Sequence, residues 1–203
     1  MGKVGRIGYH RPIRGSIPRP RPNLVNTRMS AIRRVTTIEQ HLIDDFVAAI
    51  PTPDTWQVSQ AEIKNTAIRE SRGMVFRFQD TDRPVDPTLS ISDTENRTLY
   101  PQIEPLLNLA TSTKYGTELG RVRISCLPPG AKVAPHIDRG RYFEIHNRLM
   151  FPLTTNPKCS FWLDGKGPYR PEVGCVYYFD NQKKHRSVNN GSTYRMFLMV
   201  DVR

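Results

Sequence analysis

The sequence contains little cysteine and no long apolar run. Its three cysteines, Cys126, Cys159 and Cys175, form no C-x-x-C pair, which argues against a disulfide scaffold and a cysteine-ligated zinc site. No stretch reaches the roughly 18 apolar residues that a membrane-spanning helix needs, and no apolar signal segment follows the basic start. We therefore expect a cytoplasmic protein that is neither membrane-embedded nor secreted.

Acidic residues are absent from the first 38 positions, and Glu39 is the first in the chain. Residues 1–34 carry nine of the 30 Lys and Arg residues, whereas the other 169 residues hold 21 cations and 19 acids. The net charge of +11 is therefore concentrated in this segment. Its P-R-P-R-P stretch, residues 18–22, favours extended polyproline II, and few apolar residues are available to stabilise a fold. We expect residues 1–35 to form a basic, flexible arm.

Three interpretations of this arm compete. Its arginines would neutralise the phosphates of a nucleic acid or the charges of another polyanion. An organelle transit peptide is also rich in arginine and poor in acids, so organelle targeting stays open beside the cytoplasm. The third interpretation is a solvated or oligomer-contacting tail, because charge runs are weak signals.

Residues 36–203 predict one domain, in which 36–118 are helical and mixed and 119–203 form the core strands. Thr37 and Gln40 fit a capping box, and the apolar spacing that follows predicts a helix ending at Pro51. A second helix is predicted over 101–113. Strands are predicted at 74–78, 121–127, 149–153, 159–163, 175–179, 185–188 and 194–202. Many short strands at this spacing indicate a sandwich or barrel, the jelly roll among them.

His136, Asp138 and His185 carry side chains that bind metals. Residues two apart on a strand point to the same face, so His136 and Asp138 would reach one ion from one side. His185 would arrive from a different strand. Two imidazoles and one carboxylate leave three open positions, as in the facial triad of non-haem Fe(II) oxygenases. On spacing alone, a surface histidine and a turn aspartate explain H-x-D equally well.

Arg195 lies ten residues after His185 and opens the apolar run Met196–Val200. Asn190-Gly191 predicts a type I′ hairpin, which would return Arg195 alongside the His185 strand. A guanidinium at that place would bind a carboxylate in bidentate fashion at a fixed distance from the metal. The alternative is a solvent-facing strand residue, which the apolar neighbours make the weaker interpretation.

Three stretches of the second half add a family pattern. They are R-I-S-C-L-P-P-G-A-K-V-A-P-H (123–136), G-C-V-Y-Y-F-D-N-Q-K-K-H (174–185) and S-V-N-N-G-S-T-Y-R-M-F-L-M-V-D-V (187–202). In order and spacing, residues 119–202 resemble the aspartyl/asparaginyl β-hydroxylase family of iron- and 2-oxoglutarate-dependent oxygenases. The resemblance implies a mainly β fold with flanking helices, a double-stranded β-helix (a cupin-like jelly roll) with iron bound inside its mouth.

The resemblance also implies roles for the metal and co-substrate residues. His136 and His185 match the two iron histidines, and Arg195 matches the arginine that binds the distal carboxylate of 2-oxoglutarate. Asp138 stands where some animal members have glycine, so we expect the full triad here. Ser125, eleven residues before His136, matches a serine that contacts the co-substrate, although a plain strand hydroxyl is the alternative.

One part of the family pattern departs from this sequence. The family often has an Arg-x-His pair on the strand after the first ligand, whereas this chain has His146-Asn147-Arg148, the same types in reverse order. With a one-residue shift, His146 and Arg148 would line the co-substrate pocket. An ion pair at a strand edge is the alternative for both residues.

The implied chemistry needs Fe(II), 2-oxoglutarate and O₂, with decarboxylation of 2-oxoglutarate to succinate coupled to hydroxylation of a C–H bond. The expected substrate is an Asp, Asn or similar side chain in a peptide, a protein or a small metabolite. Tyr142 is a candidate substrate contact. Trp162 is a second candidate pocket aromatic, although core packing is the stronger expectation for it. Two alternatives stay open. One is a non-catalytic β-helix binding module, recruited to nucleic acid or another polyanion by the arm, and the other is a metal cupin without 2-oxoglutarate.

Overall fold

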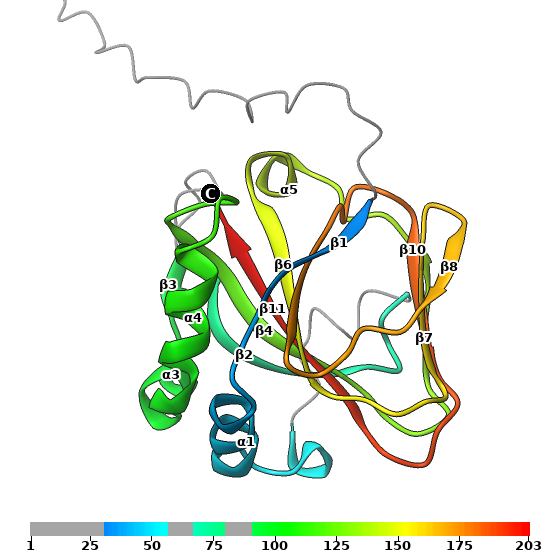
Figure 1. The fold of residues 1–203 in the computed structure, drawn as a ribbon, viewed down its shortest axis with the longest axis horizontal. Coiled ribbons are helices and arrows are strands. Elements are labelled where there is room, and N and C mark those ends of the chain that lie inside the picture. Colours follow the sequence, from blue (N-terminus) through cyan, green and yellow to red (C-terminus); the bar gives the residue numbers. More distant parts are fainter. Residues whose placement is uncertain (1–30, 57–66, 80–90) are drawn as a thin grey trace, which may run out of the picture.

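The computed structural model describes residues 31–56, 67–79 and 91–203, and in these ranges two antiparallel sheets face each other (Figure 1). The large sheet has the strand order β1-β9-β6-β11-β4-β2-β3, and the small sheet has the order β5-β10-β7-β8. From β4 to β11, consecutive strands alternate between the sheets except for β7 and β8, which form a hairpin within the small sheet. This is the predicted double-stranded β-helix. Most of the predicted basic arm lies outside the described residues.

The elements have the following bounds. The large sheet consists of β1 (Ile32–Thr37), β2 (Arg72–Gln79), β3 (Ile91–Asp93), β4 (Leu119–Leu127), β6 (Asn147–Thr154), β9 (Cys175–Phe179) and β11 (Arg195–Val202). The small sheet consists of β5 (Lys132–His136), β7 (Cys159–Leu163), β8 (Lys166–Tyr169) and β10 (His185–Asn189). The helical elements are α1 (Gln40–Ala49), η1 (Pro53–Thr55), α3 (Glu95–Leu99), η2 (Pro101–Ile103), α4 (Glu104–Thr111) and α5 (Arg141–Ile145).

The outer face of the large sheet packs against helices. In Figure 1, α3 and α4 lie on the left of this sheet and α1 lies below it. Phe46 of α1 and Leu106 of α4 are fully buried and belong to the same apolar cluster as Ile124 of β4 and Leu198 of β11. Burying side chains of this size contributes about 1.5–3 kcal/mol each, so this cluster is a main source of stability.

The inner face of β4 is polar. Successive side chains of a strand point to opposite faces, so Val122 and Ile124 enter the core while Arg121, Arg123 and Ser125 face the space between the sheets. A smaller apolar cluster that includes Met150, Phe161 and Phe179 joins the two sheets. The alternation of side chains along β4 therefore places polar residues on the cavity side and apolar residues in the core on the other side.

The N-terminal elements begin differently from the prediction. Residues Ile32–Thr37 form β1, which pairs antiparallel with β9, so the sheet begins within the segment assigned to the arm. The helix starts at Gln40, and its N-cap Glu39 makes no side-chain capping hydrogen bond, so the predicted capping box is wrong. The β-branched run Val35-Thr36-Thr37 favours a strand, and the edge of β9 supplies its partner.

The predicted hairpin at Asn190–Gly191 is also wrong. Neither residue has a positive φ, and β10 and β11 pair in different sheets rather than with each other. The two successive positive φ values of a type I′ turn occur instead at Asp164 (53°) and Gly165 (75°), which join β7 to β8. Strands β5 and β8 were not predicted, because their short, polar or proline-containing sequences carry no period-two apolar pattern.

No helix in the described ranges is long and apolar enough to span a membrane.

Candidate metal centre and co-substrate cavity

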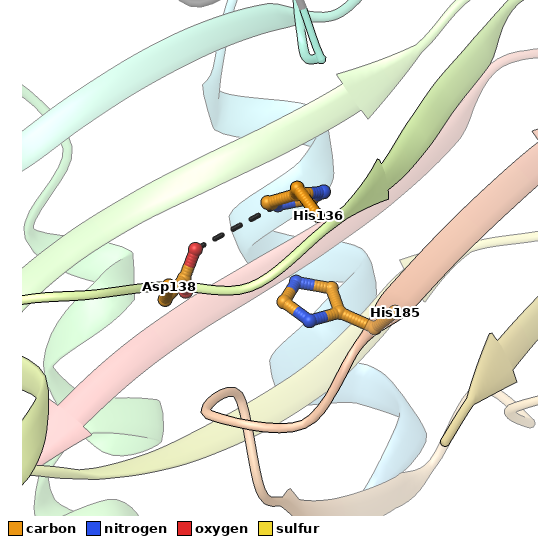
Figure 2. Close-up of side chains that lie close together, drawn as sticks. All are labelled: His136, Asp138 and His185. Carbon is orange, nitrogen blue, oxygen red and sulfur yellow. Dashed lines mark ion pairs between the residues drawn. The ribbon is translucent and has the colours of Figure 1, made fainter. Parts of the chain in front are cut away.

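His136, Asp138 and His185 lie close together at one end of β5 and β10 in the small sheet (Figure 2). His136 ends β5 and His185 begins β10, and the two residues are direct partners in the antiparallel ladder, with ring centroids 4.2 Å apart. Asp138 lies just beyond β5, where its N–H donates to the carbonyl of Asn181 at 3.1 Å. One ligand atom from each side chain lies within 4.8 Å of the others. The geometry thus offers three ligands to one ion.

Backbone carbonyls orient both imidazoles. Nδ1 of His136 lies 2.9 Å from the carbonyl oxygen of Ala134, and Nδ1 of His185 lies 2.9 Å from that of Lys183. A carbonyl oxygen only accepts, so each Nδ1 carries the hydrogen. The Nε2 lone pairs are left available to a metal, which is the usual arrangement around protein-bound metals.

The carboxylate of Asp138 is held by one of its two oxygens. Oδ2 accepts hydrogen bonds from Nη1 of Arg148 at 2.5 Å and from Nδ2 of Asn181 at 3.0 Å. Oδ1 lies 3.6 Å from Nε2 of His136. Because Oδ2 is engaged, Asp138 is set to bind a metal through Oδ1 alone, which leaves more coordination positions open.

Arg148 is fixed between two aspartates. Its Nε and Nη2 donate to the two carboxylate oxygens of Asp201 at 2.7 and 2.9 Å, while Nη1 donates to Asp138. Asp201 is 2% exposed, so this is a buried, charge-assisted network. The network ties the metal-binding loop to β6 and β11 of the large sheet.

The charge states suit a divalent cation. Burial, with the neighbouring imidazole of His136, lowers the pKa of His185 to about 4. Burial alone would raise the pKa of Asp138, but the charge of Arg148 and then that of His185 outweigh it and hold this pKa below its ordinary value. At neutral pH the site therefore presents an ionised carboxylate and a neutral His185, which are the forms that bind metals.

A cavity of about 420 Å³ opens onto these ligands from between the sheets. Its described lining contains two aspartates, Asp138 and Asp201, both bound to Arg148. It also contains six arginines, Arg121, Arg123, Arg139, Arg148, Arg186 and Arg195. The excess of positive charge favours an anionic ligand.

Arg195 provides the test of whether 2-oxoglutarate fits. Its side chain is 3% exposed and packs on the ring of Phe197, 4.2 Å from guanidinium carbon to ring centroid. Burial lowers its pKa to about 10, its Nε has no hydrogen-bond partner, and no described carboxylate pairs with it. A buried, unpaired cation is costly, so the residue needs an anionic partner that the described part of the chain does not supply. Ser125, 6% exposed, lines the same cavity from β4.

The other predicted pocket residues lie in different places. His146 is 2% exposed and does not line the cavity; its Nδ1 contacts the carbonyl of Tyr142 at 2.9 Å and its ring stacks on that of Tyr142. Tyr142 is also outside the cavity lining. Arg148 does line the cavity, but its guanidinium is bound to the two aspartates. Trp162 is outside the core, against the guanidinium of Arg186 at 4.1 Å, so that prediction is wrong.

Two residues near the site, Asn181 and Arg121, were not predicted from the sequence. Asn181 follows F-D within G-C-V-Y-Y-F-D-N and orients Asp138, a contact that only the fold creates. Arg121 belongs to R-V-R-I-S, where charged residues recur at every second position of a buried strand. That alternation was a detectable sign of a polar interior face.

The fold and the three-ligand centre together define a class, the double-stranded β-helix proteins with a facial metal triad. Residues 48–203, more than half of the chain, match the sequence profile of the aspartyl/asparaginyl β-hydroxylase family. The chain belongs to this family, and it is a 2-oxoglutarate-dependent dioxygenase by class. A search of curated protein sequences found no significant match.

Solved structures share the fold. An oxidoreductase of the 2OG-Fe(II) oxygenase family from Burkholderia pseudomallei is similar with a TM-score of 0.54 and 12% identity, over 81% of this chain and 78% of that one. A Pseudomonas putida prolyl-4-hydroxylase is similar with a TM-score of 0.50 and 15% identity, over 85% of this chain and 92% of that one. At these identities the likeness shows the architecture.

Proposed function

We propose that the protein binds Fe(II) through His136, Asp138 and His185 and hydroxylates a C–H bond of an Asp- or Asn-like side chain, using 2-oxoglutarate and O₂. The observation that carries the co-substrate assignment is Arg195, a buried guanidinium in the cavity of the triad, for which the described residues provide no carboxylate partner. A metal cupin without 2-oxoglutarate has no use for such a residue. The substrate would be a peptide, a protein or a small metabolite.

Each part of the cavity has a distinct task in this proposal. Arg195, with Ser125 beside it, binds the distal carboxylate and so sets the angle at which the other end of 2-oxoglutarate meets the metal. When bound, Fe(II) supplies the activation of O₂ that hydroxylation requires. Phe161 and Phe179 line the cavity beside His185 and limit the access of water to the centre.

The proposed roles of His146 and Arg148 in binding 2-oxoglutarate rest on different observations. Arg148 borders the cavity, and its positive charge adds to the attraction of a dianion, so we keep it in the proposed co-substrate environment. His146 would act through Tyr142, on which it stacks, rather than by contact. Tyr142 in turn supports Arg121, which contacts the cavity.

We also propose that residues 1–34 bind a polyanion such as RNA or DNA, on the strength of their nine cations and absence of acids. The rest of the chain is nearly balanced in charge, so the segment is the main source of attraction. Deletion of residues 1–30 is expected to abolish salt-dependent RNA and DNA binding. Unchanged affinity in the truncated protein would remove this proposal and leave the oxygenase proposal intact.

The central experiment is an anaerobic Fe(II) titration with and without 2-oxoglutarate, which follows the weak visible metal-to-ligand charge-transfer band. The band should require both components, disappear in His136→Ala and weaken in Arg195→Ala. Arg170→Gln, which removes an exposed guanidinium outside the cavity, is the matched control and should keep the band. Folded, metal-loaded wild-type protein without the band would contradict the proposal.

A further inference from the structure

We propose that Arg121 forms an anion subsite on the metal side of the cavity, and that this subsite selects a substrate whose reacting side chain is a carboxylate over one with the neutral amide. The inference deepens the proposed function and rests on it. Within the broad class of Asp- or Asn-like side chains, it names the carboxylate as the group that the positive charges of the cavity favour.

The position of Arg121 separates it from the co-substrate arginine. Arg195 pairs with Leu127, six positions along β4 from Arg121, which corresponds to about 20 Å of extended strand. Arg121 and Arg148, which binds Asp138, lie over the same ring of Phe143, with guanidinium carbons 5.5 and 5.2 Å from its centroid, so Arg121 lies on the metal side. A dicarboxylate that spans from the metal to Arg195 would leave Arg121 free for a second ligand.

The guanidinium of Arg121 is held by aromatic rings. Its central carbon lies 3.9 Å from the ring centroid of Tyr142, 4.8 Å from that of Phe78 and 5.5 Å from that of Phe143. The hydroxyl of Tyr142 accepts the backbone N–H of Arg121 at 2.6 Å, which fixes the ring beneath the guanidinium. Cation–π contacts of this kind orient an arginine without neutralising its charge.

No described carboxylate satisfies this cation. Nη2 donates to the amide oxygen of Gln79 at 3.0 Å, and the buried Nε has no hydrogen-bond partner. The two aspartates in the described lining of the cavity, Asp138 and Asp201, already bind Arg148. Arg121 therefore keeps donors and a full charge for a ligand, in a partly dry environment where a charge-assisted hydrogen bond is stronger than in water.

The charge balance survives cofactor loading. A divalent cation and dianionic 2-oxoglutarate cancel each other, so Arg121 still lacks a carboxylate partner among the described lining residues. Such a site binds a carboxylate and leaves a neutral amide with a poorer hydrogen bond and no charge attraction. Discrimination between isosteric groups is large when it depends on a buried polar partner.

The test compares N-acetyl-L-aspartate N-methylamide with N-acetyl-L-asparagine N-methylamide. Both are titrated calorimetrically into full-length protein loaded with Zn(II) and N-oxalylglycine, a non-reacting analogue of 2-oxoglutarate. We expect the aspartate derivative to bind at least about 10-fold more tightly. Arg121→Gln should remove this preference while the affinity for the asparagine derivative changes little. Arg121→Lys should keep part of it, because the charge remains but the fork is lost.

The controls separate this inference from the proposed function. Arg170→Gln should keep the aspartate preference, and thermal melts should show that both Arg121 variants fold. Equal binding of the two derivatives to the wild type, binding of neither at millimolar concentration, or a preference that persists in Arg121→Gln would overturn the subsite. A missing Fe(II)–2-oxoglutarate band would overturn the proposed function instead, whatever the calorimetry shows.

Discussion

At the scale of single residues, Arg148 and Asn181 determine how Asp138 faces the proposed metal site. Both donate to Oδ2, so the ligand oxygen Oδ1 is oriented by groups that do not touch the ion. Removing a hydrogen-bond partner of this kind typically lowers metal affinity about 10- to 100-fold. The orientation of one carboxylate therefore depends on Arg148 of β6 and on Asn181 in the turn between β9 and β10.

We predict that Arg148→Gln raises the Co(II) dissociation constant about 10- to 100-fold, measured anaerobically by Co(II) absorption. The change also leaves Asp201 buried and unpaired, which costs about 3–5 kcal/mol of folding free energy. The double variant Arg148→Gln/Asp201→Asn should recover stability without recovering metal affinity. Full metal affinity in the stable double variant would show that Arg148 has no orienting role.

The titration of His185 predicts a pH dependence of stability in the metal-free protein. The unfolded side chain takes up a proton near pH 6.5, whereas the folded one stays neutral down to about pH 4. Because the unfolded state binds more protons in this window, stability is fully present above pH 6.5 and is lost as the pH falls toward 4. The loss is up to about 3 kcal/mol.

Urea unfolding at several pH values measures this loss. His185→Gln removes the titrating group, so its free energy of unfolding should fall less steeply between pH 6.5 and 4 than that of the wild type. His146, whose pKa burial also lowers, contributes a slope that the variant retains. Identical slopes in both proteins would contradict the assignment to His185.

At the scale of elements, Gly120 lets α5 approach β4. A Cβ at this position would lie 2.5 Å from Oη of Tyr142 and 2.7 Å from Cδ2 of His146. Gly120→Ala should therefore cost about 1–3 kcal/mol of folding free energy by overpacking and should weaken the aspartate derivative's binding, because Tyr142 supports Arg121. The cost should shrink in a Tyr142→Phe background, in which the clashing oxygen is absent. Additive effects of the two changes would contradict this contact.

At the scale of the whole molecule, the proposed ligands bridge the two sheets. His136 and His185 belong to the small sheet, whereas Arg195 belongs to the large one. Ligand at 100 times its dissociation constant stabilises the fold by about 2.7 kcal/mol. We expect 2-oxoglutarate to raise the melting temperature of the Zn(II)-loaded wild type and to have little effect on Arg195→Ala. An equal rise in both proteins would place the co-substrate elsewhere.

Local patterns in the sequence predicted many short strands, the proposed metal ligands and a buried arginine, and the family resemblance decided between the alternatives that spacing alone left open. Short apolar runs between turns indicated the strands, and H-x-D with a distant histidine indicated the proposed ligands. Arg195, directly before the apolar run Met196–Val200, indicated a need for a partner. The helix positions followed from apolar spacing in the same way.

Only the tertiary structure decided which strand pairs with which. Asn190-Gly191 looked like a hairpin, yet β10 and β11 enter opposite sheets, and Arg195 and His185 line one cavity from different sheets. The partnership of Arg148 with Asp138 and the platform of Tyr142 under Arg121 are likewise set by long-range packing. Local propensity carries no information about such contacts, because they form only when both sheets close around one space.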